Sequence, residues 1–340
     1  MARVILFGEP MALLTADVPG PLENIVHFSR SMSGAEVNVA VGLSRLGHEV
    51  HYLSRVGDDP FGHYIQNELQ AGGIVTDLIT FDPVYRTGIQ LKNRVEDGSD
   101  PFAPYYRRGS AASRICAADI EQLQLDHTDL IHVTGIPPAL SDQAREATYA
   151  LMRRARAEGI FVTFDPNLRP ALWESEEAMI STLNELASLA DLVLPGMSEC
   201  RLLAKAETVQ EAAGFYHSLG VPTVIIKDGS KGAWISTGSS MELVQGFPVR
   251  KVVDTVGAGD GFAVGVISAL LEKQSLKDAV RRGNAIGAMQ VMTVGDNEGL
   301  PDRNKLEEFM NSYRRPPLKR ETVRNAFELV RFTGQLVPVL

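Results

Sequence analysis

Short apolar runs alternate with amphipathic segments along most of this chain of 340 residues, and this alternation limits the possible folds more than any other feature. The runs have the length and composition of buried strands, and the segments between them repeat apolar residues with the 3.6-residue period of a helix. The predicted strands cover residues 4–7, 50–54, 130–133, 160–164, 192–194 and 224–226. The predicted helices cover residues 36–46, 62–70, 142–157, 176–189, 209–219, 259–271, 276–292 and 304–313. Such alternation forms right-handed βαβ units, so we expect an α/β fold whose parallel sheet is covered by helices on both faces.

Two stretches interrupt the alternation and have strand character of their own. The first holds Pro19-Gly20-Pro21 and a strand-like segment at residues 25–28, and the second alternates apolar positions between Ile89 and Val95. We expect both to be antiparallel excursions from the sheet. They would form either one small β lid beside the active face or two unrelated surface hairpins, and the pattern fits both. The discontinuous lid would comprise residues of about 13–32 and 86–110.

Composition excludes several classes of protein. The residues are 44% hydrophobic and 22% charged, as in an ordinary globular protein and unlike a disordered chain. The formal charge of −9 disfavours nucleic acid and anionic membranes as partners. Cys116 and Cys200 form no CxxC or Cys/His cluster, so a disulfide framework and a zinc site lack support. No apolar stretch is long enough for a membrane span or a signal segment, and we expect a cytoplasmic protein.

The C-terminal residues are predicted to be a separate extension. Arg314-Arg315-Pro316-Pro317 would end the last helix, leaving residues 1–313 as one domain and 314–340 outside it. Residues 319–332 place apolar side chains on one helical face. This segment would dock on the body or on a neighbouring subunit, or else remain a basic tail.

A glycine-rich segment at residues 254–263 provides the strongest chemical signal. Gly257, Gly259 and Gly261 stand where an extended segment meets an apolar helix, which suits an anion such as phosphate. A carboxylate at Asp260 repels a bound phosphate but could accept a proton from a hydroxyl that attacks it. Stabilisation of the helix dipole by Asp260 is an equally good explanation. The spacing matches neither GxGxxG nor GxxxxGK[ST], which removes support for dinucleotide and Walker-type sites.

A second segment, Gly34-Ala35-Glu36-Val37-Asn38, opens a predicted helix. Asn38 on its first turn could recognise a hydroxyl group, although asparagine at this position more often caps the helix locally. The two segments, in this order, resemble the two signatures of the ribokinase-like (phosphofructokinase-B type) carbohydrate kinases. Within that family the match is nearest to the 2-keto-3-deoxygluconate kinases. The sub-family resemblance rests on residues 105–111, 132–141, 164–169 with Leu172-Trp173, and 295–299.

The resemblance covers about residues 4–313 and implies a three-layer α/β/α fold with a mostly parallel central sheet and a small β lid. The sugar would lie between lid and sheet, beside ATP. Asp260 would be the catalytic base, and Gly257, Ala258 and Gly259 would offer backbone N–H groups to the transferring phosphoryl group.

The substrate implied by the resemblance carries a carboxylate, which Arg107 and Arg169 would each bind through two hydrogen bonds. The other residues that would contact the sugar are Gly34, Asn38, Gln90, Tyr105, Tyr106, Asp260 and Asp296. Two of these have simple alternatives: Arg107 could be a surface arginine of a lid strand, and Asp296 a turn residue.

On the nucleotide side, the loop 227–232 and the helix 276–292 resemble the family's ATP-binding segments. The residues implied are Ser198, Lys227, Gly229, Lys231 and Gly232, together with Gly257 and Gly259, and Asn284 near the adenine. Lysine in a glycine-rich turn is also a common solvated loop residue. Where many family members have Asn-x-x-Glu near magnesium, this chain has Ser198-Glu199-Cys200-Arg201. Glu199 or water could replace the missing acid, or the register could differ, so the protein ligands of Mg²⁺ stay open.

The resemblance thus implies ATP-dependent phosphorylation of 2-keto-3-deoxygluconate to 2-keto-3-deoxy-6-phosphogluconate. Kinases of fructose or 5-keto-2-deoxygluconate, and a sugar-binding regulator that has lost catalysis, are the alternatives. We also expect a homo-oligomer, a dimer or larger, because lid-mediated dimers are common in the family.

Overall fold

The computed structural model describes residues 2–96, 101–293 and 295–313. Within these residues, nine strands form one sheet in the order β13-β12-β11-β10-β9-β8-β1-β4-β5. The strands from β5 to β11 in this order are parallel, and β12 runs antiparallel to both β11 and β13. The bounds are β1 (Arg3–Phe7), β4 (Glu49–Gly57), β5 (Ile79–Asp82), β8 (Thr128–Thr134), β9 (Phe161–Asp165), β10 (Leu192–Val193), β11 (Thr223–Lys227), β12 (Gly232–Ser236) and β13 (Met241–Gln245).

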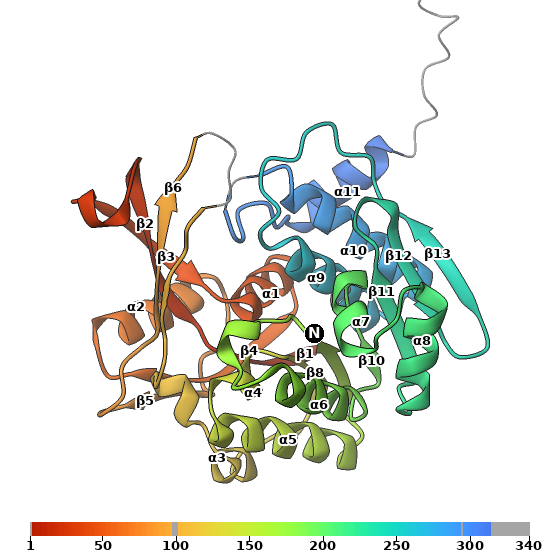
Figure 1. The fold of residues 1–340 in the computed structure, drawn as a ribbon, viewed down its shortest axis with the longest axis horizontal. Helices are drawn as coiled ribbons and strands as arrows, with labels where there is room; N and C mark the ends of the chain where they lie inside the picture. Colours follow the sequence, from red (N-terminus) through yellow and green to blue (C-terminus); the bar gives the residue numbers. More distant parts are fainter. Residues whose placement is uncertain (1, 97–100, 294, 314–340) are drawn as a thin grey trace, which may run out of the picture.

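Helices cover both faces of this sheet (Figure 1). Val4 and Leu6 of β1 pack on one helical layer, and Ile5 and Phe7 on the other, because successive side chains of a strand point to opposite faces. The first layer contains α1 (Ala35–Arg45), α2 (Pro60–Ala71), α9 (Ala258–Leu271), α10 (Leu276–Gln290) and α11 (Arg303–Ser312). The second contains α3 (Ala117–Glu121), α4 (Pro137–Leu140), α5 (Asp142–Ala157), α6 (Glu176–Ala187), α7 (Met197–Leu203) and α8 (Val209–Ser218). The predicted three-layer α/β/α fold with a mostly parallel central sheet is confirmed.

A smaller sheet stands beside the body in the order β3-β2-β6-β7 (Figure 1). Its strands are β2 (Met11–Pro19), β3 (Phe28–Ser33), β6 (Ile89–Arg94) and β7 (Tyr105–Tyr106). The two interrupting stretches therefore meet in one sheet and are not unrelated hairpins. The expectation of antiparallel pairing is wrong for the two inner strands of this sheet, since β2 and β6 run parallel.

The strand expected at residues 25–28 begins only at Phe28. Leu22–Asn24 form a short 3-10 helix after Pro21, and Val26 is 82% exposed, so no strand partner covers this segment. The hairpin of β12 and β13, the edge strand β5 and the short helices α3, α4 and α7 were not predicted. The extension at 314–340 and its predicted helix lie outside the described residues.

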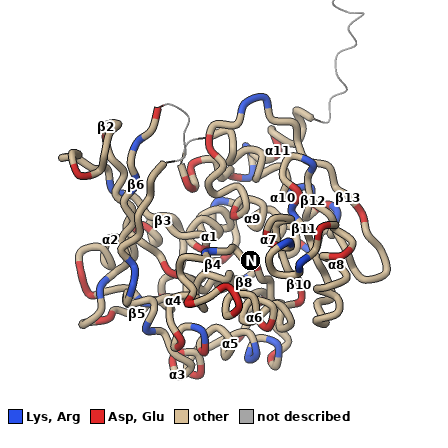
Figure 2. Tube along the Cα trace, viewed as in Figure 1, with Lys and Arg blue, Asp and Glu red and all other residues tan. Residues whose placement is uncertain are grey.

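Acidic and basic residues alternate along the chain in both the small sheet and the body (Figure 2). Among the described residues, no helix combines the length and the apolar character that crossing a bilayer would require.

Candidate active site

Two helix N-termini, those of α1 and α9, meet at the base of the small sheet. The helices approach closely because Gly42 of α1 faces α9, where a Cβ atom at Gly42 would lie 2.5 Å from Val264 Cγ2. This packing brings the first turns of the two helices together. There the Asn38 amide donates from Nδ2 to Asp260 Oδ2 over 2.8 Å. The two sequence signatures, 222 residues apart at these positions, therefore share one site.

The turn that begins α9 requires glycine at residue 257. Gly257 has a φ of +74°, and a Cβ atom there would lie 2.4 Å from the Asp296 carbonyl oxygen. The first N–H groups of a helix lack intrahelical acceptors and carry the positive end of its dipole. The Ala258 amide makes only a long contact, 3.4 Å, to the Thr255 carbonyl. This end of α9 can hold an anion beside Asp260.

The Asp260 carboxyl group is partly buried and faces the cavity between the small sheet and the two helix N-termini. Burial raises its pKa to about 6; the nearby Asp165 carboxylate acts in the same direction, and the Asn38 hydrogen bond and the Arg169 charge oppose it. Asn167 Nδ2 approaches the other carboxylate oxygen at 3.5 Å. A carboxylate with this pKa is largely ionised at neutral pH and is a stronger base than an ordinary aspartate.

Lys227 extends from the end of β11 toward the same helix N-terminus. Its ammonium group donates to Asp165 Oδ2 over 2.7 Å and lies 3.7 Å from the position of a Cβ atom at Gly259. Burial by itself lowers the pKa of Lys227, but the Asp165 and Glu199 carboxylates outweigh it and the net pKa is raised. Lys227 therefore stays charged next to the α9 anion site.

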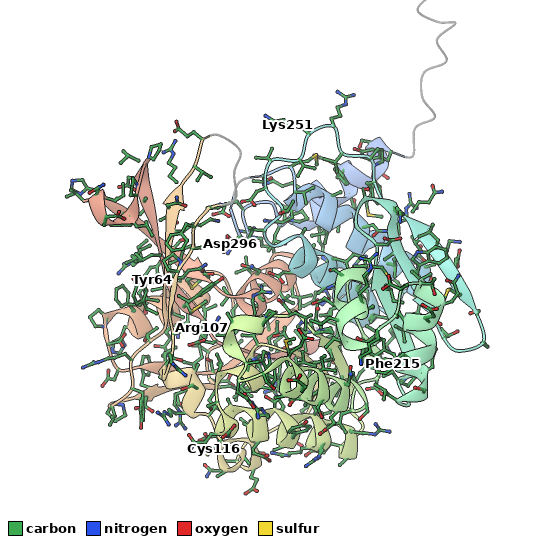
Figure 3. The ribbon with its side chains drawn as sticks, in the orientation of Figure 1. Tyr64, Arg107, Cys116, Phe215, Lys251 and Asp296 are labelled. Carbon is green, nitrogen blue, oxygen red and sulfur yellow. The ribbon has the colours of Figure 1, made fainter. Side chains whose placement is uncertain are left out.

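A cavity of about 220 Å³ lies between the small sheet and the two helix N-termini. Arg107 and Asp296 both lie in this region, between the small sheet and the helices of the body (Figure 3). The predicted sugar-contacting residues that line the cavity are Gly34, Asn38, Gln90, Tyr105, Arg107, Arg169, Asp260 and Asp296, joined by Gly257. Tyr106 does not line it. This residue is 63% exposed because it follows Tyr105 in β7 and points to the opposite face.

The three cations of the cavity differ in their partners. Arg107 is paired with the buried Glu9. Lys92, which the sequence did not single out, is paired with Asp296 at 3.2 Å. Arg169 is exposed, donates to a backbone carbonyl at 2.9 Å and forms no ion pair within the part of the chain that is described. The Arg169 charge is thus the one that remains available to an incoming anion.

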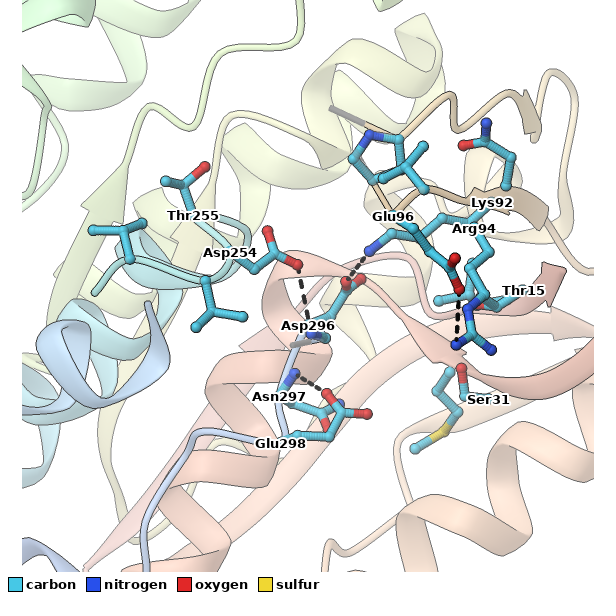
Figure 4. Close-up of a pocket in the computed structure, with 18 of the residues that line it drawn as sticks. Thr15, Ser31, Lys92, Arg94, Glu96, Asp254, Thr255, Asp296, Asn297 and Glu298 are labelled. Atoms are coloured by element: carbon cyan, nitrogen blue, oxygen red, sulfur yellow. Dashed lines mark hydrogen bonds and ion pairs between the residues drawn. The ribbon is translucent and has the colours of Figure 1, made fainter. Parts of the chain in front are cut away.

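A second cavity of about 750 Å³ adjoins the first (Figure 4). The small sheet forms one wall, and the loops at residues 252–255 and 295–298 form the other. Lys92 and Asp296 line both cavities, so their ion pair stands at the boundary between them. Gln90 and Ser33 adjoin this boundary, with the Ser33 hydroxyl donating to Gln90 Oε1 at 2.6 Å.

The residues expected on the nucleotide side have mainly local partners. Gly229, at a φ of +57°, and Lys231 form the short turn before β12, and Lys231 is paired with Asp228. Gly232 starts β12, and Ser198 is exposed on the first turn of α7. Asn284 donates to two backbone carbonyls at the end of β13, which gives it a structural role. Their part in nucleotide binding stays a prediction.

Glu199, and not Arg201, faces the site. The Glu199 carboxylate accepts hydrogen bonds from the backbone N–H groups of Gly196, at 2.6 Å, and Leu168, at 3.0 Å. Burial raises the pKa of Glu199. Arg201 is half exposed and approaches Glu207 at 3.5 Å. Whether Glu199 or water would take the place of the missing acid stays a prediction.

Mg²⁺ prefers oxygen ligands and usually keeps several waters, bound through one or two carboxylates and substrate phosphates. Asp165 and Glu199 supply such carboxylates beside Lys227. No three acidic, histidine or cysteine side chains gather closely enough to hold an ion among residues 2–96, 101–293 and 295–313. The site therefore fits a metal held mainly by nucleotide phosphates and water.

Comparison of the sequence with known proteins identifies the family of this chain. Residues 1–303 match the model of the pfkB family carbohydrate kinases. The chain is 45% identical over 311 residues to a 2-dehydro-3-deoxygluconokinase of Bacillus subtilis, covering 91% of this chain and 96% of that one. It is 31% identical to a protein of the same name from Thermoproteus tenax, over 92% and 95% of the two chains. A fructokinase of Vibrio alginolyticus is 29% identical over 82% and 91%.

Solved structures of carbohydrate kinases superpose on this chain over most of its length. A PfkB protein from Polaromonas sp. JS666 superposes with a TM-score of 0.83 at 44% identity, covering 90% of this chain and 99% of that one. A fructokinase from Vibrio cholerae, with fructose, ADP and a calcium ion bound, has a TM-score of 0.79 at 30% identity, covering 91% and 99%. The chain belongs to the pfkB family of carbohydrate kinases.

Proposed function

We propose that this carbohydrate kinase transfers the γ-phosphoryl group of ATP to the 6-hydroxyl of 2-keto-3-deoxygluconate and forms 2-keto-3-deoxy-6-phosphogluconate. The observation that carries the proposal is the pair of arginines, Arg107 and Arg169, in the same cavity as Asp260. The two relatives named 2-dehydro-3-deoxygluconokinase, a synonym for the kinase of this sugar acid, support the choice of substrate.

In the proposed reaction Asp260 takes the proton of the attacking hydroxyl. The hydroxyl oxygen forms a bond to the γ-phosphorus as the bond from that phosphorus to the bridging oxygen breaks, and ADP leaves with the electron pair. The N–H groups at Gly257, Ala258 and Gly259 and the Lys227 ammonium would stabilise the charge on the transferring group. The contact between Asn38 and Asp260 orients the base and leaves the second oxygen, Oδ1, toward Asn167.

Magnesium, when bound with the nucleotide, would neutralise phosphate charge. Glu199 and Asp165 are the carboxylates that would face its water shell, and Lys227 keeps them from repelling the phosphates.

Arg169 is the group that would distinguish a sugar acid from a neutral sugar. A carboxylate gains a charge-assisted hydrogen bond from Arg169 that a ketohexose such as fructose cannot form. Because Arg169 has no carboxylate partner of its own in the described residues, binding does not require an existing ion pair to break.

The test is a kinetic panel with the purified full-length chain, ATP and Mg²⁺, using 2-keto-3-deoxygluconate, 5-keto-2-deoxygluconate and fructose. We expect the first to have the highest kcat/KM and ³¹P NMR to locate the product phosphate on the terminal carbon. Arg169→Met should raise the KM of the sugar acid by about tenfold or more and leave that of fructose within about twofold. Arg201→Met is the matched control, since Arg201 lies half exposed at the Glu207 side of α7.

Three results would redirect the assignment. Equal kcat/KM for fructose would contradict the carboxylate argument, and preference for 5-keto-2-deoxygluconate would change the substrate. Sugar binding without turnover of any sugar would indicate a regulator that has lost catalysis.

The chain is further proposed to act in the cytoplasm, where ATP is supplied and where Cys116 and Cys200 stay reduced, as a homo-oligomer built on the small sheet. The edge strand β7 of this sheet exposes Tyr106, and Val18 at the end of β2 is 55% exposed. The exposed edge strand β7, with further apolar side chains exposed on the same sheet, favours contact with a second copy. Light scattering coupled to gel filtration measures the mass, and Tyr106→Glu should lower it to that of one chain.

A further inference from the structure

Glu9 lies in the segment Gly8-Glu9-Pro10, between β1 of the central sheet and β2 of the small sheet. Its side chain is 1% exposed. Arg107 donates from Nε to Glu9 Oε2 over 2.6 Å, and its Nη2 contacts the same oxygen. The Ser110 hydroxyl donates to the other oxygen, Oε1. One buried carboxylate is therefore bound by two residues that follow β7.

Glu9 also contacts the other segments that connect the small sheet to the body. A Cβ atom at Gly88, just before β6, would lie 2.7 Å from Glu9 Oε1. A Cβ atom at Gly34, just after β3, would lie 2.9 Å from the Glu9 carbonyl oxygen. The chain thus enters and leaves the small sheet around this one residue, and glycine at both positions permits the close approach.

The contacts fix the guanidinium group of Arg107. Arg107 is 7% exposed, and Glu9 binds it along the edge that carries Nε and Nη2. The Tyr105 ring lies beside it, 5.6 Å from the guanidinium carbon to the ring centroid. Nη1 has no hydrogen-bond partner in the described part of the chain, and Arg107 lines the sugar cavity. Only the edge that carries Nη1 is left for a ligand.

We propose that Glu9 is a positioning residue, which holds Arg107 so that the remaining edge of its guanidinium binds the carboxylate of the sugar acid. This inference rests on the proposed function and adds a residue to it. A rigid side chain loses less conformational freedom on binding, so Glu9, which is nearly buried where it lines the cavity, raises affinity through Arg107. It also keeps the buried cation compensated when no sugar is bound.

A second consequence concerns the small sheet as a whole. Since Glu9 lies against residues at the base of β3, β6 and β7, the orientation of Arg107 and the placement of the small sheet depend on the same residue. A change at Glu9 therefore alters sugar binding through geometry, while the ATP site around Lys227, built on β11 and α9, is left intact.

The experiment is a comparison of Glu9→Gln with Asp59→Asn in the full-length chain. Asp59 is a matched control because it also lies buried at the junction, accepting hydrogen bonds from Thr87 N and Oγ1 at 2.9 Å, yet lines neither cavity. We expect Glu9→Gln to raise the KM of the sugar acid by about tenfold, with kcat and the KM of ATP within about twofold. Asp59→Asn should lower the melting temperature and leave the KM of the sugar unchanged.

A double-mutant cycle with Arg107→Lys decides whether Glu9 acts through Arg107. If it does, the two substitutions together raise the KM no more than Arg107→Lys alone. Three results would each overturn the proposal. The effects of the two substitutions on the KM could multiply, the KM of Glu9→Gln could be unchanged or lowered, or Asp59→Asn could raise the KM equally. If Glu9→Gln does not fold, Ser110→Ala removes one contact of Glu9, and the same KM should rise by a smaller factor; no rise would refute the role.

Failure of this proposal and failure of the substrate assignment can be told apart. Wild-type enzyme that prefers fructose would refute the sugar acid as substrate. The cycle would then be run with fructose, and non-additive KM changes would still assign Glu9 to the positioning of Arg107, whereas additive changes would refute it.

Discussion

Replacing Glu36 by glutamine should remove a pH-dependence of stability that this one carboxyl group creates. Glu36 is on the first turn of α1 and is fully buried. The Thr134 hydroxyl donates to Oε1, and Oε2 has no partner among the residues described. Burial raises the pKa of Glu36 from 4.5 to about 7, against the opposing hydrogen bond from Thr134.

The sign and size of the effect follow from proton binding. Between pH 4.5 and about 7 the folded chain keeps a proton on Glu36 that the unfolded chain has lost. The folded state binds more protons there, so the free energy of unfolding falls as the pH rises through this window. Since one pKa unit is worth about 1.4 kcal/mol, the loss amounts to about 3 kcal/mol and is complete above pH 7. Glutamine cannot ionise, so Glu36→Gln does not have this loss.

Urea unfolding at a series of pH values from 4.5 to 8 measures the difference between the two chains. The unfolding free energy of Glu36→Gln, relative to wild type, should increase by about 3 kcal/mol across this range. Other titrating groups, Asp260 among them, are present in both chains and largely cancel. Thr134→Val removes a hydrogen bond that favours the ionised carboxyl, so its loss of stability should extend to higher pH. A difference that stays constant with pH would refute the reasoning.

Two further predictions concern the N-terminal end of α9, where the proposed reaction takes place. Because burial raises the pKa of Asp260 to about 6, the kcat/KM of the wild type should fall about tenfold per pH unit below that value. Asp260→Asn should lower kcat by about 10³-fold and abolish this pH dependence. A profile that is flat between pH 5 and 7 in wild type would remove Asp260 as the base. Gly257→Ala should lower kcat and cost about 1–3 kcal/mol of stability, since residue 257 has a φ of +74° and a Cβ would meet the Asp296 carbonyl at 2.4 Å. Gly214→Ala on α8, where a Cβ would meet nothing within 4 Å, is the control and should be neutral or slightly stabilising, as measured by thermal unfolding.

The sequence was sufficient for six strands and eight longer helices of the body, because each has its own local period, but not for β5, β12, β13 or the short helices α3, α4 and α7. It also predicted that Asp260 and Asn38 share a site, and the structure brings the two side chains into contact; their roles in the reaction stay predictions. Strand alternation could have separated Tyr105 from Tyr106, because neighbouring residues of a strand cannot both face one cavity. The hairpin of β12 and β13 was missed although Gly238 marks its turn.

Contacts between distant segments were beyond the sequence. Arg107 and Glu9 are 98 residues apart, and Lys92 and Asp296 are 204 apart, so no local pattern pairs them. The first pairing depends on how the segments before β2 and after β7 meet at the base of the small sheet, and the second on how β6 lies against the loop at residues 295–298. The sequence could therefore identify the charged residues of the site, but it could not show which of them already form an ion pair.

That compensation changes how an acidic chain can bind two anions. Three cations near the site have carboxylate partners: Arg107 with Glu9, Lys92 with Asp296 and Lys227 with Asp165. A chain with a net charge of −9 thus keeps these cations oriented without accumulating uncompensated positive charge in a buried site. Among the described residues that line the cavity, Arg169 and the α9 N-terminus are then left to attract an anion over a distance. Under the proposed function, selectivity for a carboxylate would depend on one charge, that of Arg169, and on one orientation, that of Arg107. If Arg107 instead bound the sugar acid through its net charge, the Glu9 carboxylate would weaken binding by neutralising that charge. Glu9→Gln would then lower the KM of the sugar acid instead of raising it.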